Sequence, residues 1–286
     1  MQASLRFSRY TTNGVTLHCA EAGPEDGRLV ILLHGFPEFW YGWRYQINEL
    51  ALAGYRVVVP DQRGYNKSTK PEGVAAYSID TLAADVIGLA DALGRRHFGL
   101  AGHDWGGVVG WWAVSRYPDR IERFAALNAP HPMAWRDAVR NNPVQRKMSR
   151  YIAFFQLPWL PEFALRWGNF KALTYAFRQS RRPDAFSDAD LAKYRAAWSE
   201  PGALTAMLNW YRAIAQKQVP AGSPPRITVP VLVIWGVQDA YLVPELAEAS
   251  ANLCANASVA SMDEATHWVQ YDARERVNAL LLKFLK

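Results

Sequence analysis

Residues 102–106 read Gly-His-Asp-Trp-Gly. Glycines two residues before and two residues after Asp104 mark a sharp turn whose central side chain is a candidate nucleophile. Such turns usually carry serine at the centre. A carboxylate that attacks an ester carbonyl gives a mixed anhydride, whereas one that attacks an sp3 carbon gives an ordinary ester that water can later cleave. Asp104 therefore indicates a substrate with an electrophilic saturated carbon, such as an epoxide or an alkyl halide.

The flanks of this motif predict a strand, a tight turn and a helix. Residues 97–101 form a short apolar run, and apolar residues between 108 and 114 continue as a buried helical segment that ends near Pro118. Glycines at 102, 106 and 107 allow the sharp turn and let helix and strand approach closely. The alternative, a solvated Asp104 that caps a helix, is disfavoured by this pattern.

The composition is that of an ordinary globular protein. With 286 residues, 50% hydrophobic content and 12 tryptophans, the chain can bury the core of one domain, or of one domain with an insertion. The net charge is +6, but basic residues are dense only at 95–96 and 178–182. This scatter favours a solvated face over a patch for polyanions, so we expect no nucleic-acid partner.

The cysteines and the hydropathy of the chain indicate where in the cell the protein is expected. Cys19 and Cys254 lie far apart without metal-type spacing, so we expect neither a disulfide framework nor a metal site. No segment approaches the roughly 20 apolar residues of a membrane span, and the N-terminus lacks an apolar stretch. These features predict a soluble, cytoplasmic protein.

Extended and helical patterns alternate along most of the chain. This alternation predicts a mostly parallel sheet covered by helices. The predicted strands are 15–20, 29–33, 55–59, 97–101, 121–127, 229–235 and 258–262, and the predicted helices are 42–53, 80–93, 108–117 and 272–285. The run 29–33 is apolar throughout, which is typical of a strand buried on both faces.

One segment of about a hundred residues carries helical patterns without any strand. The predicted helices are 144–155, 162–177, 187–198 and 203–215, and Ser187 with Asp190 resembles a capping box. The Pro-rich stretch 219–225 then returns the chain to the sheet. We expect a core domain of residues 1–130 and 224–286 and a helical lid of residues 131–223 over the strand ends, where ligands bind in open sheets of this class. An independent helical domain is the alternative.

An aspartate nucleophile needs a base that activates water, and the sequence offers one. His267 falls between the last strand and the last helix, and Asp239 follows a strand end, where its carboxylate could orient the imidazole. The order nucleophile, acid, histidine is that of α/β hydrolases. The backbone N–H groups of Phe36 and Trp105 are the candidate donors for a transient oxyanion. His34 and His103 are interpreted as packed or supporting residues.

Five strings together resemble the epoxide hydrolases of the α/β-hydrolase fold. They are His34-Gly35-Phe36-Pro37-Glu38-Phe39-Trp40, Asp61-Gln62-Arg63-Gly64-Tyr65, Gly102-His103-Asp104-Trp105-Gly106-Gly107, Asn128-Ala129-Pro130-His131-Pro132 and Thr266-His267-Trp268. The resemblance covers nearly the whole chain except the lid, but the dehalogenases of the same group share several of these strings. It also implies that Glu38 and His103 help to position the attacking water.

The lid separates these two groups. Epoxide hydrolases of this kind use two lid tyrosines that hold the epoxide oxygen, and the resemblance places them at Tyr151, before Phe155-Gln156, and Tyr211, in Asn209-Trp210-Tyr211-Arg212. A haloalkane dehalogenase would clamp halide with the indole after the nucleophile and with an Asn or second Trp. Trp105 supplies one half of that clamp, but position 36 is Phe. The fluoroacetate dehalogenases carry Arg where this chain has Trp105.

The sequence thus predicts an epoxide hydrolase that works through an ester on Asp104, with a dehalogenase as the alternative. The partners are an epoxide and water, and no cofactor or metal is expected. Many aromatic residues in the lid predict an apolar cavity for aryl or alkyl epoxides; they are Phe154, Phe155, Trp159, Phe163, Trp167, Phe170, Tyr175 and Phe177. A ligand-binding receptor on the same scaffold that has lost catalytic turnover stays open as an alternative function. A homodimer stays open as the oligomeric state.

Overall fold

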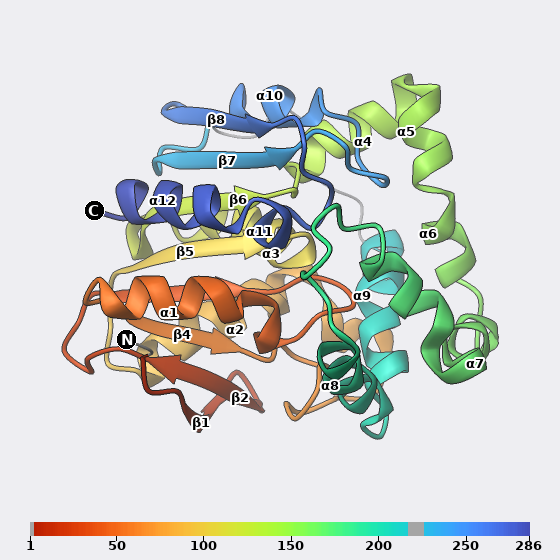
Figure 1. Ribbon diagram of the computed structural model, residues 1–286, viewed down its shortest axis with the longest axis horizontal. Helices are drawn as coiled ribbons and strands as arrows, with labels where there is room; N and C mark the ends of the chain where they lie inside the picture. The colour runs from red at the N-terminus through yellow and green to blue at the C-terminus, as the bar shows by residue number, and fades with distance from the viewer. Residues whose placement is uncertain (1–2, 217–225) are drawn as a thin grey trace.

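The computed structural model describes residues 3–216 and 226–286. An eight-stranded sheet of order β1-β2-β4-β3-β5-β6-β7-β8 forms its centre (Figure 1). The pairs β1–β2 and β2–β4 are antiparallel, and all pairs from β4 to β8 are parallel. This sheet confirms the predicted fold class. The strands are β1 (Arg6–Thr12), β2 (Val15–Ala22), β3 (Leu29–Leu33), β4 (Arg56–Pro60), β5 (Phe98–His103), β6 (Ile121–Leu127), β7 (Val231–Gly236) and β8 (Ala257–Met262).

The buried strands separate two hydrophobic clusters. In β3, Leu29, Ile31 and Leu33 join one cluster while Val30 and Leu32 join the other, because successive side chains of a strand point to opposite faces. Figure 1 shows α1 (Arg44–Leu52) and α12 (Arg274–Phe284) in front of the sheet, and α2 (Ile79–Ala92) and α3 (Trp105–Arg116) behind it. Both faces are therefore covered, as the continuous apolar runs predict.

Three elements are not predicted by the sequence patterns: β1, α4 (Pro132–Asn141) and α10 (Leu246–Ala251). β1 alternates exposed with half-buried residues, so it carries no apolar run, and its pairing with β2 holds it in place. The helix predicted at 272–285 corresponds to α12, and the short helix α11 (Val269–Asp272) precedes it. Short 3-10 turns complete this layer at Trp40–Trp43, Val74–Tyr77 and Pro118–Arg120.

The remaining helices form a cap at the end of the sheet to which the strand arrows of Figure 1 point. The segment predicted as one helix at 144–155 forms two helices. The helix predicted at 162–177 is interrupted at residues 167–170, where Gly168, Asn169 and Phe170 have positive φ. The capping box of Ser187 and Asp190 is present. The helices of the cap are α4, α5 (Pro143–Met148), α6 (Arg150–Phe155), α7 (Leu160–Phe177), α8 (Asp188–Ser199) and α9 (Ala203–Gln216).

Three indole groups fasten the cap to the sheet layer. The Nε1 atom of Trp198 donates to the carbonyl of Pro37 at 2.6 Å, that of Trp210 to Arg63 at 3.0 Å, and that of Trp268 to Ala176 at 2.8 Å. One hydrophobic cluster contains residues of both cap and sheet layer. The cap is therefore packed on the strand ends, which disfavours an independent helical domain. The Pro-rich return at 219–225 lies outside the described residues.

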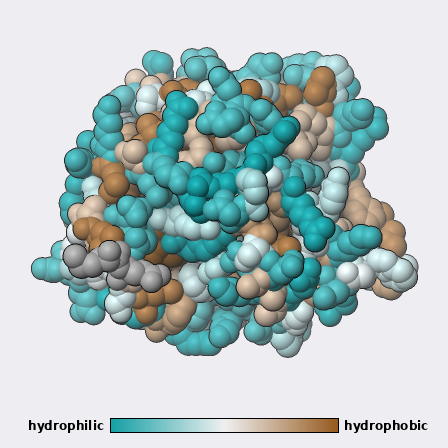
Figure 2. Space-filling view, viewed as in Figure 1, coloured by the Kyte–Doolittle hydropathy of each residue, from teal (hydrophilic) through white to brown (hydrophobic). Residues whose placement is uncertain are grey.

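The surface in front of the sheet is mostly hydrophilic, with apolar residues in separate patches (Figure 2). None of the helices in the described ranges has both the length and the apolar character that crossing a membrane requires. Both cysteines are buried free thiols.

Candidate active site

Asp104 stands at the turn between β5 and α3, with φ +50° and ψ −121°. Few residues other than glycine adopt a positive φ, so the surrounding packing must hold this turn in place. A Cβ atom on Gly102 would lie 2.4 Å from the carbonyl oxygen of Gly106, and one on Gly106 would lie 2.2 Å from that of Leu33. Glycine is thus required at both positions. The turn leaves the Asp104 side chain 18% exposed at the mouth of the strand ends.

Both carboxylate oxygens of Asp104 face polar partners. The N–H of Phe36 donates to Oδ1 at 2.7 Å, and Nε2 of His267 lies 3.6 Å from Oδ2. Burial favours a raised pKa for Asp104, but the hydrogen bond and charge of His267, together with the Phe36 N–H, outweigh it and lower the pKa. Asp104 is therefore ionised at neutral pH. Trp105 begins α3, so its N–H belongs to the first turn, whose donors have no intrahelical carbonyl.

His267 is held by the carboxylate of Asp239. Its Nδ1 donates to Asp239 Oδ2 at 2.7 Å. The N–H groups of Tyr241 and Leu242 donate to the other carboxylate oxygen of Asp239, Oδ1, at 2.7 and 3.2 Å. Burial lowers the pKa of His267, but the charge of Asp239 and the nearby Asp104 more than offset this and raise it to about 10. The imidazole is thus a cation in the resting site, with its tautomer set by Asp239.

Asn128 also holds Asp239, a role that the sequence patterns do not predict. Its Nδ2 donates to Asp239 Oδ2 at 2.8 Å and to the carbonyl of Gly236 at 3.1 Å, and its Oδ1 accepts from the Gly236 N–H at 2.8 Å. Asn128 has φ +38° directly after β6. It therefore ties the end of β6 to the end of β7. Its position as a polar residue at a strand end, at the start of one of the five strings that resemble epoxide hydrolases, is the signal that could have suggested it.

Glu38 and His103 lie behind His267, both fully buried. The Nε2 of His103 donates to the His267 carbonyl at 2.8 Å, and its Nδ1 lies 3.0 Å from Glu38 Oε2. Tyr271 and Tyr194 donate to Glu38 Oε1 at 2.5 and 3.1 Å. Burial favours a raised pKa for Glu38, but the hydrogen bond and charge of His103 outweigh it and lower the pKa. The two tyrosines are further members of this network that sequence reasoning missed.

His34 does not face Asp104 as a reactive group. Its ring is buried, and its Nε2 accepts from the Gln62 N–H at 3.1 Å. Burial lowers its pKa, so the ring is neutral. This placement agrees with the interpretation of His34 as a packed residue.

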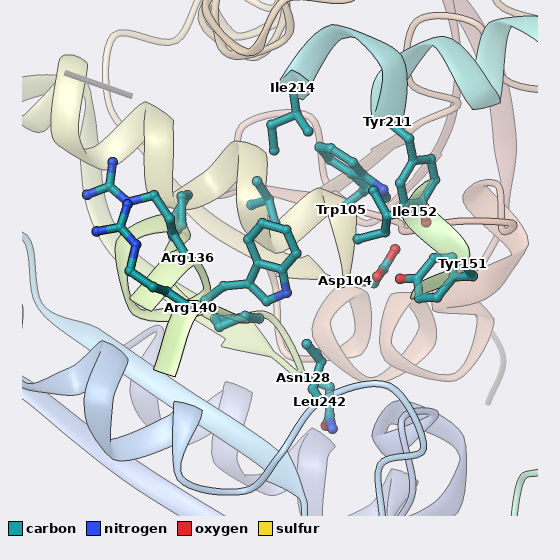
Figure 3. Close-up of a pocket in the computed structure, with 14 residues that line it drawn as sticks. Asp104, Trp105, Asn128, Arg136, Arg140, Tyr151, Ile152, Tyr211, Ile214 and Leu242 are labelled. Carbon is teal, nitrogen blue, oxygen red and sulfur yellow. The ribbon is translucent and has the colours of Figure 1, made fainter. Parts of the chain in front are cut away.

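Tyr151 from α6 and Tyr211 from α9 lie beside Asp104 (Figure 3). The Tyr211 ring packs edge-on against the rings of Trp105 and Phe36, with centroids 5.0 and 5.3 Å away. Burial is the main cause that raises the pKa of both hydroxyls, and the negative charge of Asp104 adds to it. Both hydroxyls therefore keep their protons at neutral pH, as hydrogen-bond donors toward the space above Asp104.

Two cavities meet at Asp104 and these two tyrosines. The larger is about 450 Å³ and extends toward α4, and the smaller is about 170 Å³ and extends toward α7 and His267. Of the eight lid aromatic residues named above, Phe155 alone borders either cavity. Four others are exposed, Trp159, Phe163, Trp167 and Tyr175, while Phe170 and Phe177 are buried within the cap. Most lid aromatics thus do not form the cavity wall.

Comparison with known proteins assigns the family. A family model described as alpha/beta hydrolase fold matches residues 28–273. The chain belongs to the α/β hydrolase fold family. It is 48% identical over 275 residues to the AB hydrolase superfamily protein YfhM of Bacillus subtilis, covering 96% of both chains. It is 36% identical over 286 residues to human epoxide hydrolase 4, covering 98% of this chain and 78% of that protein.

Solved structures give the same family. This hydrolase superposes on the Bacillus megaterium epoxide hydrolase, solved in complex with an inhibitor, with a TM-score of 0.89 and 32% identity over 97% of this chain and 99% of that one. A variant of the Bacillus megaterium enzyme has also been solved with its diol product. The resemblance inferred from the sequence motifs is therefore confirmed.

In this α/β hydrolase, the structure brings all nine predicted site residues into one cluster. Asp104, His267 and Asp239 are linked in series, the tyrosines lie over Asp104, Phe36 and Trp105 flank it, and Glu38 and His103 support the His267 backbone. The described residues hold no group of three or more His, Cys, Asp or Glu placed for a metal ion.

Proposed function

We propose that this hydrolase converts epoxides to vicinal diols through an ester between Asp104 and the substrate. One observation carries the proposal: two protonated tyrosines line the same cavities as an ionised carboxylate and lie beside it. A carboxylate alone could attack many electrophiles, but paired acids beside it suit a leaving oxygen that stays attached to the carbon skeleton. Relatives named as epoxide hydrolases support the same activity.

Ring opening is the first step. Asp104 attacks one carbon of the epoxide while Tyr151 and Tyr211 donate hydrogen bonds to the epoxide oxygen, and one of them gives its proton as the C–O bond breaks. The product is a hydroxyalkyl ester on Asp104. The larger cavity, with Trp135, Ile152 and Leu242 in its wall, accommodates the hydrocarbon part of the substrate.

Ester hydrolysis is the second step, and His267 is its base. Ester formation removes the negative charge of Asp104, which is one of the causes that raise the His267 pKa. The pKa of the imidazole therefore falls as the ester forms, so His267 gives up its proton, and the tyrosinate left by ring opening takes one up. The neutral imidazole can then accept a proton from water. The resulting hydroxide attacks the ester carbonyl, and the N–H groups of Phe36 and Trp105 stabilise the oxyanion. The bond between the carbonyl carbon and the diol oxygen then breaks, the diol oxygen takes the proton from His267, and Asp104 is left as a carboxylate. Glu38 and His103 position the water through the backbone of His267.

The proposed division of the chain follows these roles. A core of residues 1–130 and 224–286 supplies nucleophile, base and acid, and a cap of residues 131–223 supplies the tyrosines. A halide clamp at Trp105 is less well supported, because position 36, where such a clamp would have its second donor, is Phe.

A single turnover in heavy-oxygen water tests the ester route. With enzyme in excess over styrene oxide, the label should enter the Asp104 carboxylate, because hydroxide attacks the carbonyl of the ester rather than the substrate carbon. Peptide mass spectrometry would locate the label, and Asp104→Ala is the control that should form no diol. Label in the diol with none in the protein would overturn the proposal.

A further inference from the structure

Two arginines line the larger cavity at its far end from Asp104. Arg136 and Arg140 lie one turn apart on α4, and Figure 3 shows both guanidinium groups on the side of the cavity opposite Asp104. Between them and Asp104 the wall is largely apolar, with Trp135, Val108, Ile152 and Ile214. A substrate that reaches from Asp104 to α4 therefore crosses an apolar stretch and ends beside positive charge.

These guanidinium groups have unused hydrogen-bonding capacity within the part of the chain that the structure describes. Nε of Arg136 is buried without a hydrogen-bond partner there, and the nearest carboxylate oxygen, Oδ1 of Asp137, is 4.0 Å away. The Arg140 guanidinium forms no hydrogen bond or ion pair with another described residue, although the Arg140 carbonyl accepts a hydrogen bond from the Arg146 side chain. Leaving such a buried donor unpaired is unfavourable.

The two charges also repel one another. Like charges at positions i and i+4 of a helix destabilise it. α4 holds them together because it is fixed at its start: the His131 side chain accepts from the Met133 N–H, and the His131 N–H donates to the Ser250 hydroxyl at 2.8 Å. Burial lowers the pKa of His131 to about 4, so it adds no third charge. The only carboxylate among the described residues of the cavity wall is Asp104.

We propose that Arg136 and Arg140 bind the carboxylate of an epoxide whose apolar chain ends in an acid, so that the preferred substrates are ω-epoxy fatty acids. This inference rests on the proposed function and refines it. The planar guanidinium fork matches a carboxylate in two-point hydrogen bonding, and an ion held there would satisfy the Arg136 donor and relieve the repulsion. The carboxylate lies far from Asp104, so it does not oppose the nucleophile.

The test compares an ω-epoxy fatty acid with its methyl ester, which has the same chain and epoxide but no charge. For the wild-type protein we expect kcat/KM to favour the acid about tenfold, as suits charge-assisted hydrogen bonds at a partly exposed site. Added salt should reduce the acid-to-ester ratio, because screening weakens the attraction. This measurement needs no variant.

The variant arm uses Arg136→Gln combined with Arg140→Gln. The acid-to-ester ratio should fall to near one. The matched control combines Arg9→Gln with Arg166→Gln, two exposed positions outside the cavity wall; it removes the same charge and should keep the ratio. If acid and ester are hydrolysed equally well by the wild-type protein, or if the control loses the preference too, this inference is wrong while the proposed function stands. If neither compound is opened, the proposed function fails and this inference with it.

Discussion

The site has two halves that are held in different ways. In the sheet layer, Asp104, Asp239 and His267 are fixed by hydrogen bonds to backbone groups and to one another. In the cap, Tyr151 and Tyr211 lie among aromatic rings, with centroid separations of 5.0 to 6.0 Å. The sheet half is thus positioned by directional hydrogen bonds, whereas the cap half is positioned by the packing of aromatic rings. The comparison predicts that damage to each half affects a different chemical step.

The largest effect that separates the halves is expected for His267→Gln. Ester hydrolysis should slow by about 10³–10⁴-fold, since the general base is lost, while ester formation continues and one equivalent of ester accumulates. Intact-protein mass spectrometry after mixing with epoxide would detect the adduct. Asp104→Ala should show no adduct. If the His267→Gln protein forms no ester, His267 acts in ester formation, and the assignment of the two steps to the two halves of the site is wrong.

Loss of the cap hydroxyls should affect the opposite step. Tyr151→Phe or Tyr211→Phe should slow ester formation by about 10²-fold, and the double change should abolish it, because no donor remains for the departing oxygen. Stopped-flow quenching of Trp fluorescence would follow the step. Tyr175→Phe is the matched control, since Tyr175 is 67% exposed on α7. Ester formation at the wild-type rate in the double variant would contradict the role of the tyrosines.

The pH dependence should differ between the two steps. Hydrolysis needs neutral His267, so below the His267 pKa of the ester state its rate should rise about tenfold per pH unit. Ester formation needs ionised Asp104, whose pKa is lowered, and protonated tyrosines, whose pKa values are raised. It should therefore vary little around neutral pH, and ester should accumulate in acid. A hydrolysis rate independent of pH would exclude His267 as the base.

The smallest effect is expected at the position that supports the base. Asn128→Ala removes one donor to Asp239 but leaves the N–H groups of Tyr241 and Leu242. Hydrolysis of the ester should slow by about tenfold, with ester formation little changed. The same substitution made in His267→Gln should add almost nothing, because both act on one function. An additive loss would assign Asn128 to another role.

Local patterns were sufficient for most of the fold. Apolar runs such as 29–33 predict buried strands because both faces of a parallel sheet are covered, and the glycines around Asp104 predict the turn because no other side chain fits there. The patterns failed where strand pairing or a helix cap, rather than an apolar run, determines that an element forms. In β1, exposed residues alternate with half-buried ones. α4 begins at Pro132, and the side chain of His131 caps its first turn.

The sequence by itself determined the fold class, the sharp turn that carries Asp104, and the order of Asp104, Asp239 and His267 along the chain, because each is written in short contiguous strings whose backbone geometry is local. Only the tertiary structure decided that Asn128 holds Asp239, that Tyr194 and Tyr271 reach Glu38, and that Arg136 and Arg140 share a cavity with Asp104. These contacts join residues that are far apart in the chain. Their distances depend on how the cap packs over the strand ends, and no local pattern encodes that packing.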